Sequence, residues 1–197
     1  MRSIRLAGYT AIIADRREQL RRTLAKMIEP AARLVWEVGS GHGHFLTAYA
    51  AAHPDETCIG IDFASERIAR ADRKRERSRL GRLHFVLADA EDFLAAMPER
   101  ARFSSIFILF PDPWPKRRHH KNRIMKPEFL TAVAARSAEG ARLYFRTDYE
   151  PYFRVAAGVI REHADWQQSD SATLPFEEPT VFEKRAARHF TLVAMLR

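Results

Sequence analysis

The sequence predicts an α/β protein built on a doubly wound, mostly parallel sheet. Short apolar runs rich in β-branched residues alternate along the chain with amphipathic stretches of helical length. Such alternation is typical of parallel strands joined by right-handed helical crossovers. No internal repeat, low-complexity tract or linker interrupts the 197 residues, and this length suits one domain. We therefore expect a single domain over residues 1–197.

The first predicted element is a helix within an N-terminal extension, residues 1–33. Apolar residues recur there at helical spacing and form one face, made of Leu20, Leu24, Met27 and Ile28. The apolar run LVWEVG follows and predicts a buried strand, and GHFLTAYAAAH predicts the helix after it.

The later elements follow from the same two patterns. Apolar runs predict buried strands, so that strands are expected at 34–39, 57–62, 82–89, 104–110, 141–147 and 189–196. Amphipathic or charged stretches predict the helices between them, at 43–53, 64–79, 91–97, 126–137 and 150–163. A polar stretch near 164–180 precedes the final strand.

Composition narrows the class of partner. The chain has 33 Lys and Arg against 25 Asp and Glu, a formal net charge of +8 that favours a polyanion, most often nucleic acid. Its cations are mostly arginine, which suits bidentate phosphate contacts. Cys58 is the only cysteine, which excludes a disulfide framework and a thiolate metal cluster. Without a long apolar run or a signal-peptide pattern, a soluble, cytoplasmic protein without membrane contact is expected.

A glycine-rich turn follows the first strand, in the sequence E-V-G-S-G-H-G. Glycines allow a positive φ and let a ligand approach the backbone closely. The dinucleotide fingerprint requires G-x-G-x-x-G. Here His44 occupies the position of the third glycine, which comes one residue early at Gly43, and this disfavours a nicotinamide or flavin cofactor. The candidate cofactor residues of this turn are Glu37, Gly39, Gly41 and Gly43.

Acidic residues end the next two strands. Asp62 lies 19 residues after Gly43, where an acid can hold both ribose hydroxyls. Asp89, before Ala90, could face an adenine ring, and Glu37 could meet a ligand ammonium. Each acid by itself could equally be a helix N-cap or a solvated strand end. Together they resemble the S-adenosylmethionine site of Rossmann-like methyltransferases.

The two histidines of the same turn, in G-H-G-H, have no nearby partners at metal-ligand spacing. We therefore expect no metal site.

The fourth strand, SSIFILF, leads directly into FPDPWPKRRHHKNR. A solvated loop needs neither the tryptophan nor the acid of this segment. Asp112 therefore stands out as a candidate for chemistry at a strand end, and the cations after it are candidates for phosphate contact. Trp114 is either a stacking surface for a base or, more in keeping with its proline-rich surroundings, a packing anchor for the loop.

The motifs taken together resemble the bacterial tRNA (guanine-N7)-methyltransferase family. That family carries E-x-G-x-G-x-G, G-I-[ED], D-A, F-P-D-P-W-x-K-x-R-H-x-K-x-R, T-D and T-x-F-E in this order, and the match spans roughly residues 34–183. Asn122 stands where the family commonly has another arginine, and Val181 where it often has lysine. The resemblance implies a Rossmann-like methyltransferase fold with an antiparallel C-terminal strand, S-adenosylmethionine as cofactor and tRNA as partner, in a monomer or homodimer.

The resemblance also implies a role for individual residues. Asp112 would be the catalytic acid and would line the cofactor site with Glu37, Asp62, Asp89 and Ala90. The implied substrate-binding residues are Lys116, Arg118, Lys121, Arg123, Asp148, Thr180, Phe182 and Glu183.

An acid beside a cationic rim suits methylation of guanine N7. This atom already carries an in-plane lone pair, so no base catalyst is needed, and alignment alone can contribute on the order of 7–11 kcal/mol. The methylated purine is positively charged, which a carboxylate favours, whereas a cation would occupy N7 as an acceptor. N7 lies in the deep major groove of A-form RNA, which side chains cannot easily reach, so the target is expected to be a guanine in a loop. In the family that this sequence resembles, the target is the guanine of the variable loop.

Two other functions remain open at the level of sequence. The D-P-W segment loosely resembles the loop of methyltransferases that act on exocyclic amines, and a catalytically inert RNA-binding homologue would keep the same fold. The basic helix near 64–79 is expected to be a solvated face, because Glu66, Asp72 and Glu76 are interspersed for pairing at helical spacing.

Overall fold

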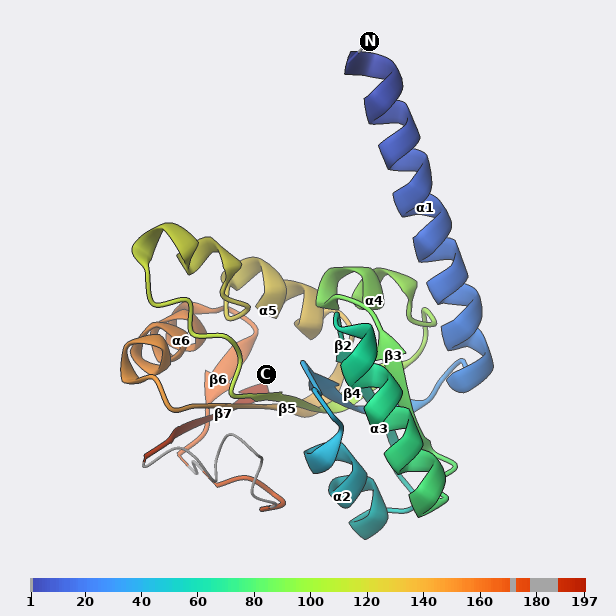
Figure 1. Ribbon diagram of the computed structural model, residues 1–197. Coiled ribbons are helices and arrows are strands. Elements are labelled where there is room, and N and C mark those ends of the chain that lie inside the picture. The colour runs from blue at the N-terminus through green and yellow to red at the C-terminus, as the bar shows by residue number, and fades with distance from the viewer. Residues whose placement is uncertain (1, 171–172, 178–187) are drawn as a thin grey trace.

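The computed structural model describes residues 2–170, 173–177 and 188–197, with side chains from residue 14 onward. Seven strands form one sheet in the order β3-β2-β1-β4-β5-β7-β6 (Figure 1). The first five are parallel, and β7 runs antiparallel to its neighbours β5 and β6. The predicted doubly wound sheet with an antiparallel C-terminal strand is therefore confirmed.

The bounds of the elements follow the predicted alternation. The strands are β1 (Arg33–Val38), β2 (Thr57–Asp62), β3 (Leu83–Leu87), β4 (Arg102–Leu109), β5 (Ser137–Thr147), β6 (Trp166–Gln168) and β7 (Phe190–Leu196). The helices are α1 (Arg2–Met27), α2 (His44–Ala52), α3 (Ser65–Ser78), α4 (Ala90–Ala96), α5 (Pro127–Ala134) and α6 (Glu150–Glu162), with a 3-10 helix, η1, at Arg117–Asn122.

The predicted boundaries were wrong in three places, one of which is the helix predicted to end at residue 137, because α5 ends at Ala134. The polar stretch near 164–180 contains a short strand, β6, because Trp166 is fully buried there and pairs with Leu196 of β7. Strand β5 begins at Ser137, four residues earlier than the apolar run suggested. In both strands, pairing with a neighbouring strand extends the sheet into residues whose local pattern is polar.

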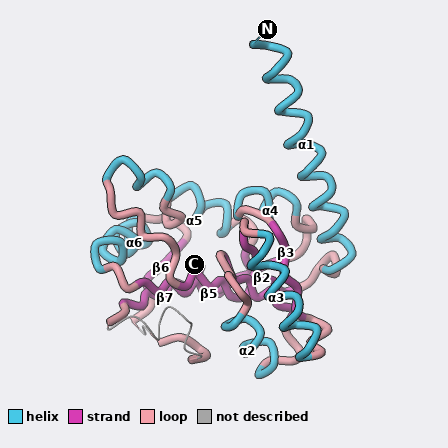
Figure 2. Tube along the Cα trace, in the orientation of Figure 1, coloured by secondary structure: helices cyan, strands magenta, loops and turns pink. Residues whose placement is uncertain are grey.

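Alternation along each strand divides the core into two layers. Leu34 and Trp36 of β1 face the layer that α1, α4, α5 and α6 cover, whereas Val35 faces the layer of α2 and α3. Trp36 lies between two aromatic rings, with centroids 5.1 Å from Phe93 and 4.8 Å from Phe103. Figures 1 and 2 show α4 and α5 on one side of the sheet and α2 and α3 on the other.

Helix α1 packs on the first layer near its C-terminal end, through Leu24 and through Ile28 directly after the helix. Its other end extends away from the sheet and its covering helices (Figure 1). No helix in the described part of the chain is long and apolar enough to span a membrane.

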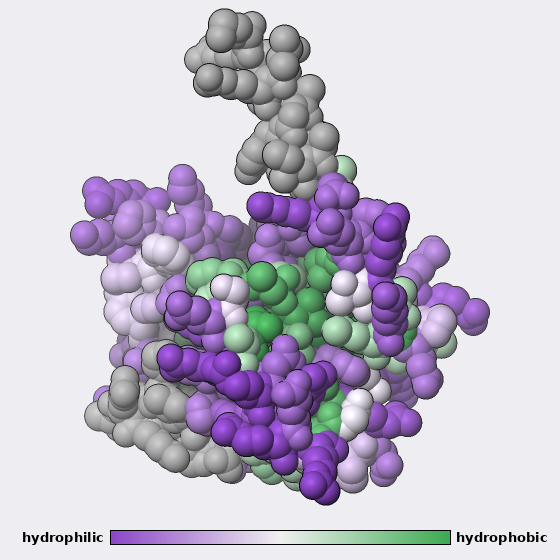
Figure 3. All heavy atoms as spheres, turned by 45° about the vertical axis from the view of Figure 1, so that its right-hand side comes forward, coloured by the Kyte–Doolittle hydropathy of each residue, from purple (hydrophilic) through white to green (hydrophobic). Residues whose placement is uncertain are grey.

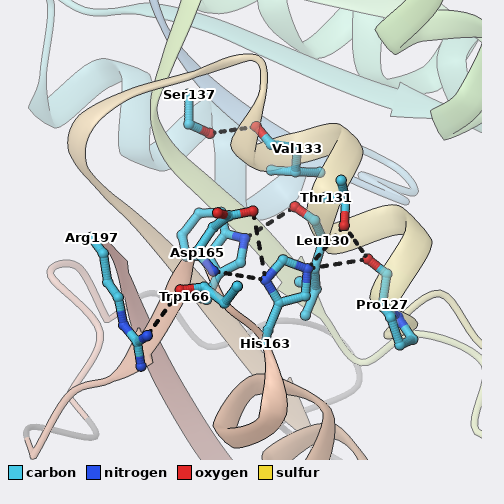
Figure 4. Close-up of polar contacts among 10 residues, drawn as sticks. Pro127, Leu130, Thr131, Val133, Ser137, His163, Asp165, Trp166 and Arg197 are labelled. Atoms are coloured by element: carbon cyan, nitrogen blue, oxygen red, sulfur yellow. Dashed lines mark hydrogen bonds and ion pairs between the residues drawn. The ribbon is translucent and has the colours of Figure 1, made fainter.

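A polar cluster joins α5, α6 and β6, and we call it the α5–α6 polar cluster (Figure 4). The indole Nε1–H of Trp166 donates to the Leu130 carbonyl at 3.0 Å. Thr131 Oγ1 lies 3.1 Å from His163 Nε2, and the Asp165 amide donates to His163 Nδ1 at 3.2 Å. Its members are Pro127, Leu130, Thr131, His163, Asp165 and Trp166.

Candidate active site

The candidate site lies at the carboxyl ends of the parallel strands. The order of the strands reverses between β1 and β4, and a ligand crevice forms at such a switch point. Glu37 lies near the end of β1, Asp112 follows β4 and Asp148 follows β5. The sheet therefore brings acids that are far apart in sequence to one edge.

The glycine turn between β1 and α2 depends on backbone conformations that glycine adopts readily. Gly39, Gly41 and Gly43 have φ values of 73°, 54° and 68°. At Gly43, an added Cβ would lie 2.5 Å from the ring of Phe85 and 2.8 Å from Cβ of Ala71. Close packing of the turn on β3 and α3 thus requires a residue without a side chain.

Glu37 is buried beneath this turn, with 4% of its surface exposed. Burial raises the pKa of its carboxyl to about 8, with a smaller contribution from the charge of Asp62. A hydrogen bond from the Leu46 amide and the charge of Lys74 oppose this pKa shift. Its Oε2 has no hydrogen-bond partner among the described residues. A cationic donor at this oxygen would relieve the cost of burying the carboxylate.

Two hydroxyl groups near Glu37 share this property. Ser40 Oγ and Thr47 Oγ1 are buried and lack a hydrogen-bond partner in the described part of the chain. Leaving such an atom unpaired costs about 1–3 kcal/mol. Of the four unpaired atoms on described residues, Trp36 Nε1 lies in the opposite core layer, and the other three gather on β1, the turn and α2 as contacts for a polar ligand. The sequence reasoning missed both hydroxyls, although a serine between two glycines of a ligand-type turn was a usable signal.

Asp62 accepts a hydrogen bond from the backbone of the glycine turn. Its Oδ2 accepts from the Gly41 amide at 3.1 Å, and its Oδ1 accepts from the Ala64 amide at 2.8 Å. Arg67 Nη1 lies 3.5 Å from Oδ2. The residue is only 2% exposed, so the structure gives it a local function that the sequence did not indicate: it joins the glycine turn to the start of α3.

Asp89 is exposed and caps α4, because its Oδ1 accepts from the Asp92 amide at 2.8 Å. The helix-cap alternative therefore applies to this acid, and its second oxygen stays open to solvent. Ala90 follows as the first residue of α4.

Two apolar side chains beside these acids escaped the sequence reasoning. Phe63, directly after Asp62, is 73% exposed, and Leu87, at the end of β3, is 52% exposed. The sheet register pairs Leu87 with Asp62. Leu87 and Phe63, which directly follows Asp62, therefore lie at the same edge of the sheet. Exposed apolar residues at a ligand edge suit the flat face of a base. Their signal in the sequence is an apolar residue placed at or just past a strand end.

The loop after β4 holds a strained conformation. Phe110 and Trp114 have φ values of 50° and 43°, in the left-handed region that large side chains avoid. The Phe110 amide donates to the Arg146 carbonyl at 2.8 Å and keeps the start of the loop in register with β5. Asp112 lies between these two residues, exposed, and its carboxylate has no hydrogen-bond partner among the residues described. The loop thus presents this acid to solvent at the switch point.

The predicted RNA contact of Arg123 does not suit its place in the structure. It is 4% exposed, and its guanidinium donates to the carbonyls of Pro113 and Trp114 at 2.9 and 3.4 Å. It also lies 4.7 Å from the ring centroid of Tyr152, in cation–π geometry. A guanidinium engaged in this way is not available to a phosphate. Instead, it fixes the loop that carries Asp112.

The other predicted cations of this segment are open to solvent. Lys116, Arg118 and Lys121 are exposed on and before η1. Arg118 Nε donates to His119 Nε2 at 3.2 Å, and His119 lies edge-on to Trp114 at 5.7 Å between ring centroids. Trp114 is half-buried against this histidine, an arrangement that agrees with the packing-anchor alternative.

Asp148 is exposed at the end of β5, after the fully buried Thr147. The next strand position inward, Arg146, is buried and forms two hydrogen bonds of 2.9 Å with the carboxylate of Glu177. This ion pair ties β5 to the segment before the predicted T-x-F-E residues. Thr180, Phe182 and Glu183 themselves lie outside the described residues.

Within the part of the chain that the structure describes, no three His, Cys, Asp or Glu side chains form a group that could hold a metal ion.

Comparison with known proteins identifies relatives of this chain in sequence and in fold. A family model described as "Putative methyltransferase" matches residues 31–192. A tRNA (guanine-N(7)-)-methyltransferase of Nitrosomonas europaea is 33% identical over 157 residues, covering 78% of this chain and 70% of the relative. One of Streptomyces coelicolor is 35% identical over 146 residues, covering 74% of this chain. The chain spans only 54% of the length of this second relative.

A solved structure extends the comparison to the fold. The 16S rRNA (adenine(1408)-N(1))-methyltransferase of Catenulisporales acidiphilia superposes with a TM-score of 0.60 at 20% identity, covering 92% of this chain and 90% of that one. The family model gives the methyltransferase class and the sheet order gives the Rossmann-like fold, so the chain is a Rossmann-like methyltransferase. Within that class, the chain belongs to the tRNA (guanine-N7)-methyltransferase family.

Proposed function

We propose that the protein transfers a methyl group from S-adenosylmethionine to N7 of a guanine in tRNA, in the variable loop. The observation that carries the proposal is the pairing of two features across the switch point. Unpaired buried polar atoms lie at the glycine turn after β1, and an exposed, unpaired carboxylate, Asp112, follows the adjacent strand β4. Family membership supports the same acceptor.

The residues at the ends of β1, β2 and β3 fit this cofactor. Buried Oε2 of Glu37 needs a cationic donor, which the amino group of a methionine moiety supplies. Phe63 and Leu87 offer exposed apolar surface for the adenine, and Asp89 has an oxygen left for a polar edge. Asp62 would hold the ribose with the same oxygens that accept from the amides of Gly41 and Ala64. When bound, the cofactor supplies an electrophilic methyl group on a sulfonium.

The chain's own contribution to the reaction is positioning and charge. Guanine N7 needs no deprotonation, so Asp112 serves by stabilising the positive charge that develops on the purine. Arg123 and the two left-handed residues hold the backbone of the loop that carries Asp112, which matters because displacements of about 1 Å can cost a hundredfold in rate. Exposed Lys116, Arg118 and Lys121 would hold phosphates outside the acidic centre.

Methyl transfer to bulk unmodified tRNA tests the proposal. Nuclease digestion and mass spectrometry after the reaction should find 7-methylguanosine at one variable-loop position. Methylation of an exocyclic amine would support the alternative acceptor. Calorimetric binding of S-adenosylmethionine without any methyl transfer to RNA would contradict the proposed reaction, and absence of both would favour an inert homologue.

A further inference from the structure

One face of α3 carries a row of cations that the site above does not use. Arg70, Arg73, Lys74 and Arg77 stand at helical positions i, i+3, i+4 and i+7, so their side chains share one face. The sequence suggested that this helix is merely a solvated face. The structure shows that these cations border a hollow.

That hollow lies between α3 and the glycine turn. It has a volume of about 370 Å³ and is lined by His42 of the turn, by His44 at the start of α2 and by the four cations. A second hollow of about 490 Å³ shares His42 and Arg70 with the first and continues past Arg67 to Phe63. The pair therefore leads from the cofactor edge along α3. We call the first hollow with its six lining residues the α3 cradle.

The acids of α3 do not neutralise the α3 cradle. Asp72 and Glu76 both pair with Arg75, each at 3.6 Å, and Glu66 lines the second hollow but not the cradle. Among the described residues, Arg70, Arg73 and Arg77 have no acidic partner within 4.0 Å. In Figure 3, where the α3 side of the molecule comes forward, strongly hydrophilic residues gather on this face beside a hydrophobic area.

A hydrogen bond across the cradle adds to the packing of Gly43 against α3. Lys74 Nζ donates to the His42 carbonyl at 3.0 Å, so this lysine serves the structure, and the three arginines remain for a ligand. The seven helical steps from Arg70 to Arg77 rise about 10 Å. This length exceeds a single phosphate group and suits a strand that carries successive phosphates. The overall charge of +8 favours such a polyanion.

We propose that the α3 cradle binds backbone phosphates of the RNA substrate, on the far side of the glycine turn from the Asp112 loop. The inference rests on the proposed function for the identity of the RNA. It adds a second phosphate contact, so that the RNA is held on both sides of the cofactor edge.

The test compares two triple variants of the full chain with the same change in charge. Arg70→Ala/Arg73→Ala/Arg77→Ala and a control, Arg16→Ala/Arg21→Ala/Arg22→Ala on α1, each lower the net charge from +8 to +5, since three cations are removed. All six side chains belong to exposed residues, so circular dichroism should show folded protein. Fluorescence anisotropy with labelled unmodified tRNA then measures Kd across a salt series.

We expect the cradle variant to bind tRNA roughly tenfold or more weakly, with a log–log salt slope lower by about three. Replacement of the same arginines by lysine should restore much of the slope. Affinity for S-adenosylmethionine, measured by calorimetry, should stay unchanged. Equal losses in the cradle and control variants would overturn the proposal, because they would show a general charge effect. Binding of polyglutamate as tightly as tRNA, with the same dependence on the three arginines, would also overturn it.

These outcomes separate the inference from the proposed function. Anisotropy reports RNA binding whether or not a methyl group is transferred. Wild-type methylation of N7 with unchanged binding by the cradle variant would refute the inference alone. Arginine-dependent binding without methylation by the wild type would refute the proposed reaction alone.

Discussion

The switch-point site and the α5–α6 polar cluster are both built from polar side chains, but they use them differently. In the cluster, the Trp166 indole, the Thr131 hydroxyl and both ring nitrogens of His163 have partners within the chain (Figure 4). At the site, Glu37 Oε2 and the Asp112 carboxylate lack them among the described residues. The satisfied groups of the cluster have a structural role, whereas the buried, unpaired oxygen of Glu37 is a candidate contact for a ligand.

Asp112→Ala should produce the largest effect, because it removes the exposed carboxylate without disturbing packing. We expect methyl transfer to fall by about two to three orders of magnitude, with the melting temperature unchanged. Initial rates with tRNA and differential scanning fluorimetry measure the two quantities. Retention of full activity would remove Asp112 from the catalytic role, and Asp112→Asn separates the loss of charge from the loss of shape.

Arg123→Ala tests how much the hydrogen bonds that fix the loop contribute to catalysis, compared with Asp112 itself. Loss of the bonds to Pro113 and Trp114 should lower kcat by roughly ten- to a hundredfold, while the Kd of S-adenosylmethionine stays the same. Arg123→Lys should recover part of kcat, since it keeps the charge and one donor. A purely RNA-binding role would instead raise KM for tRNA and leave kcat unchanged.

Trp166→Phe tests the other side of the comparison. It removes the donor to the Leu130 carbonyl and part of a fully buried ring, so the free energy of unfolding should fall by about 2–4 kcal/mol. Chemical denaturation measures this change. The kcat at a temperature where the variant is folded should match that of the wild type, and a selective loss of kcat would place the cluster in the functional machinery.

Glu37→Gln should give the smallest effect and one that depends on pH. The folded-state pKa of Glu37 is about 8 against an ordinary value of 4.5, so the native state holds a proton that the unfolded chain releases between these values. Wild-type stability from this group is thus present at low pH and is lost as pH rises from 4.5 to 8. The variant should gain in melting temperature relative to the wild type as pH rises from 5 to 8.

Binding of the cofactor should respond to Glu37 in the opposite sense. A ligand ammonium favours the carboxylate, so wild-type affinity for S-adenosylmethionine should increase with pH up to about 8. In Glu37→Gln, calorimetry should find weaker binding without this increase. A pH dependence that is the same in both proteins would assign it to another group.

Local patterns in the sequence determined the strands and the side chains at their ends. The glycine turn with Glu37, the acids Asp62 and Asp89, and the segment with Asp112 were predicted because each signal lies within a few consecutive residues. The family resemblance rests on the same short motifs and is confirmed by comparison with the relatives.

Only the tertiary structure decided what each polar group contacts. Arg123 is buried against the ring of Tyr152, which lies 29 positions later in the chain. Trp166 is held by a hydrogen bond to Leu130 of α5, and the polar stretch around it forms β6 by pairing with β7. Likewise, the cations of α3 face a hollow only because the glycine turn returns beside them. Burial and hydrogen bonding join residues distant in sequence, so periodicity predicts elements but not these contacts.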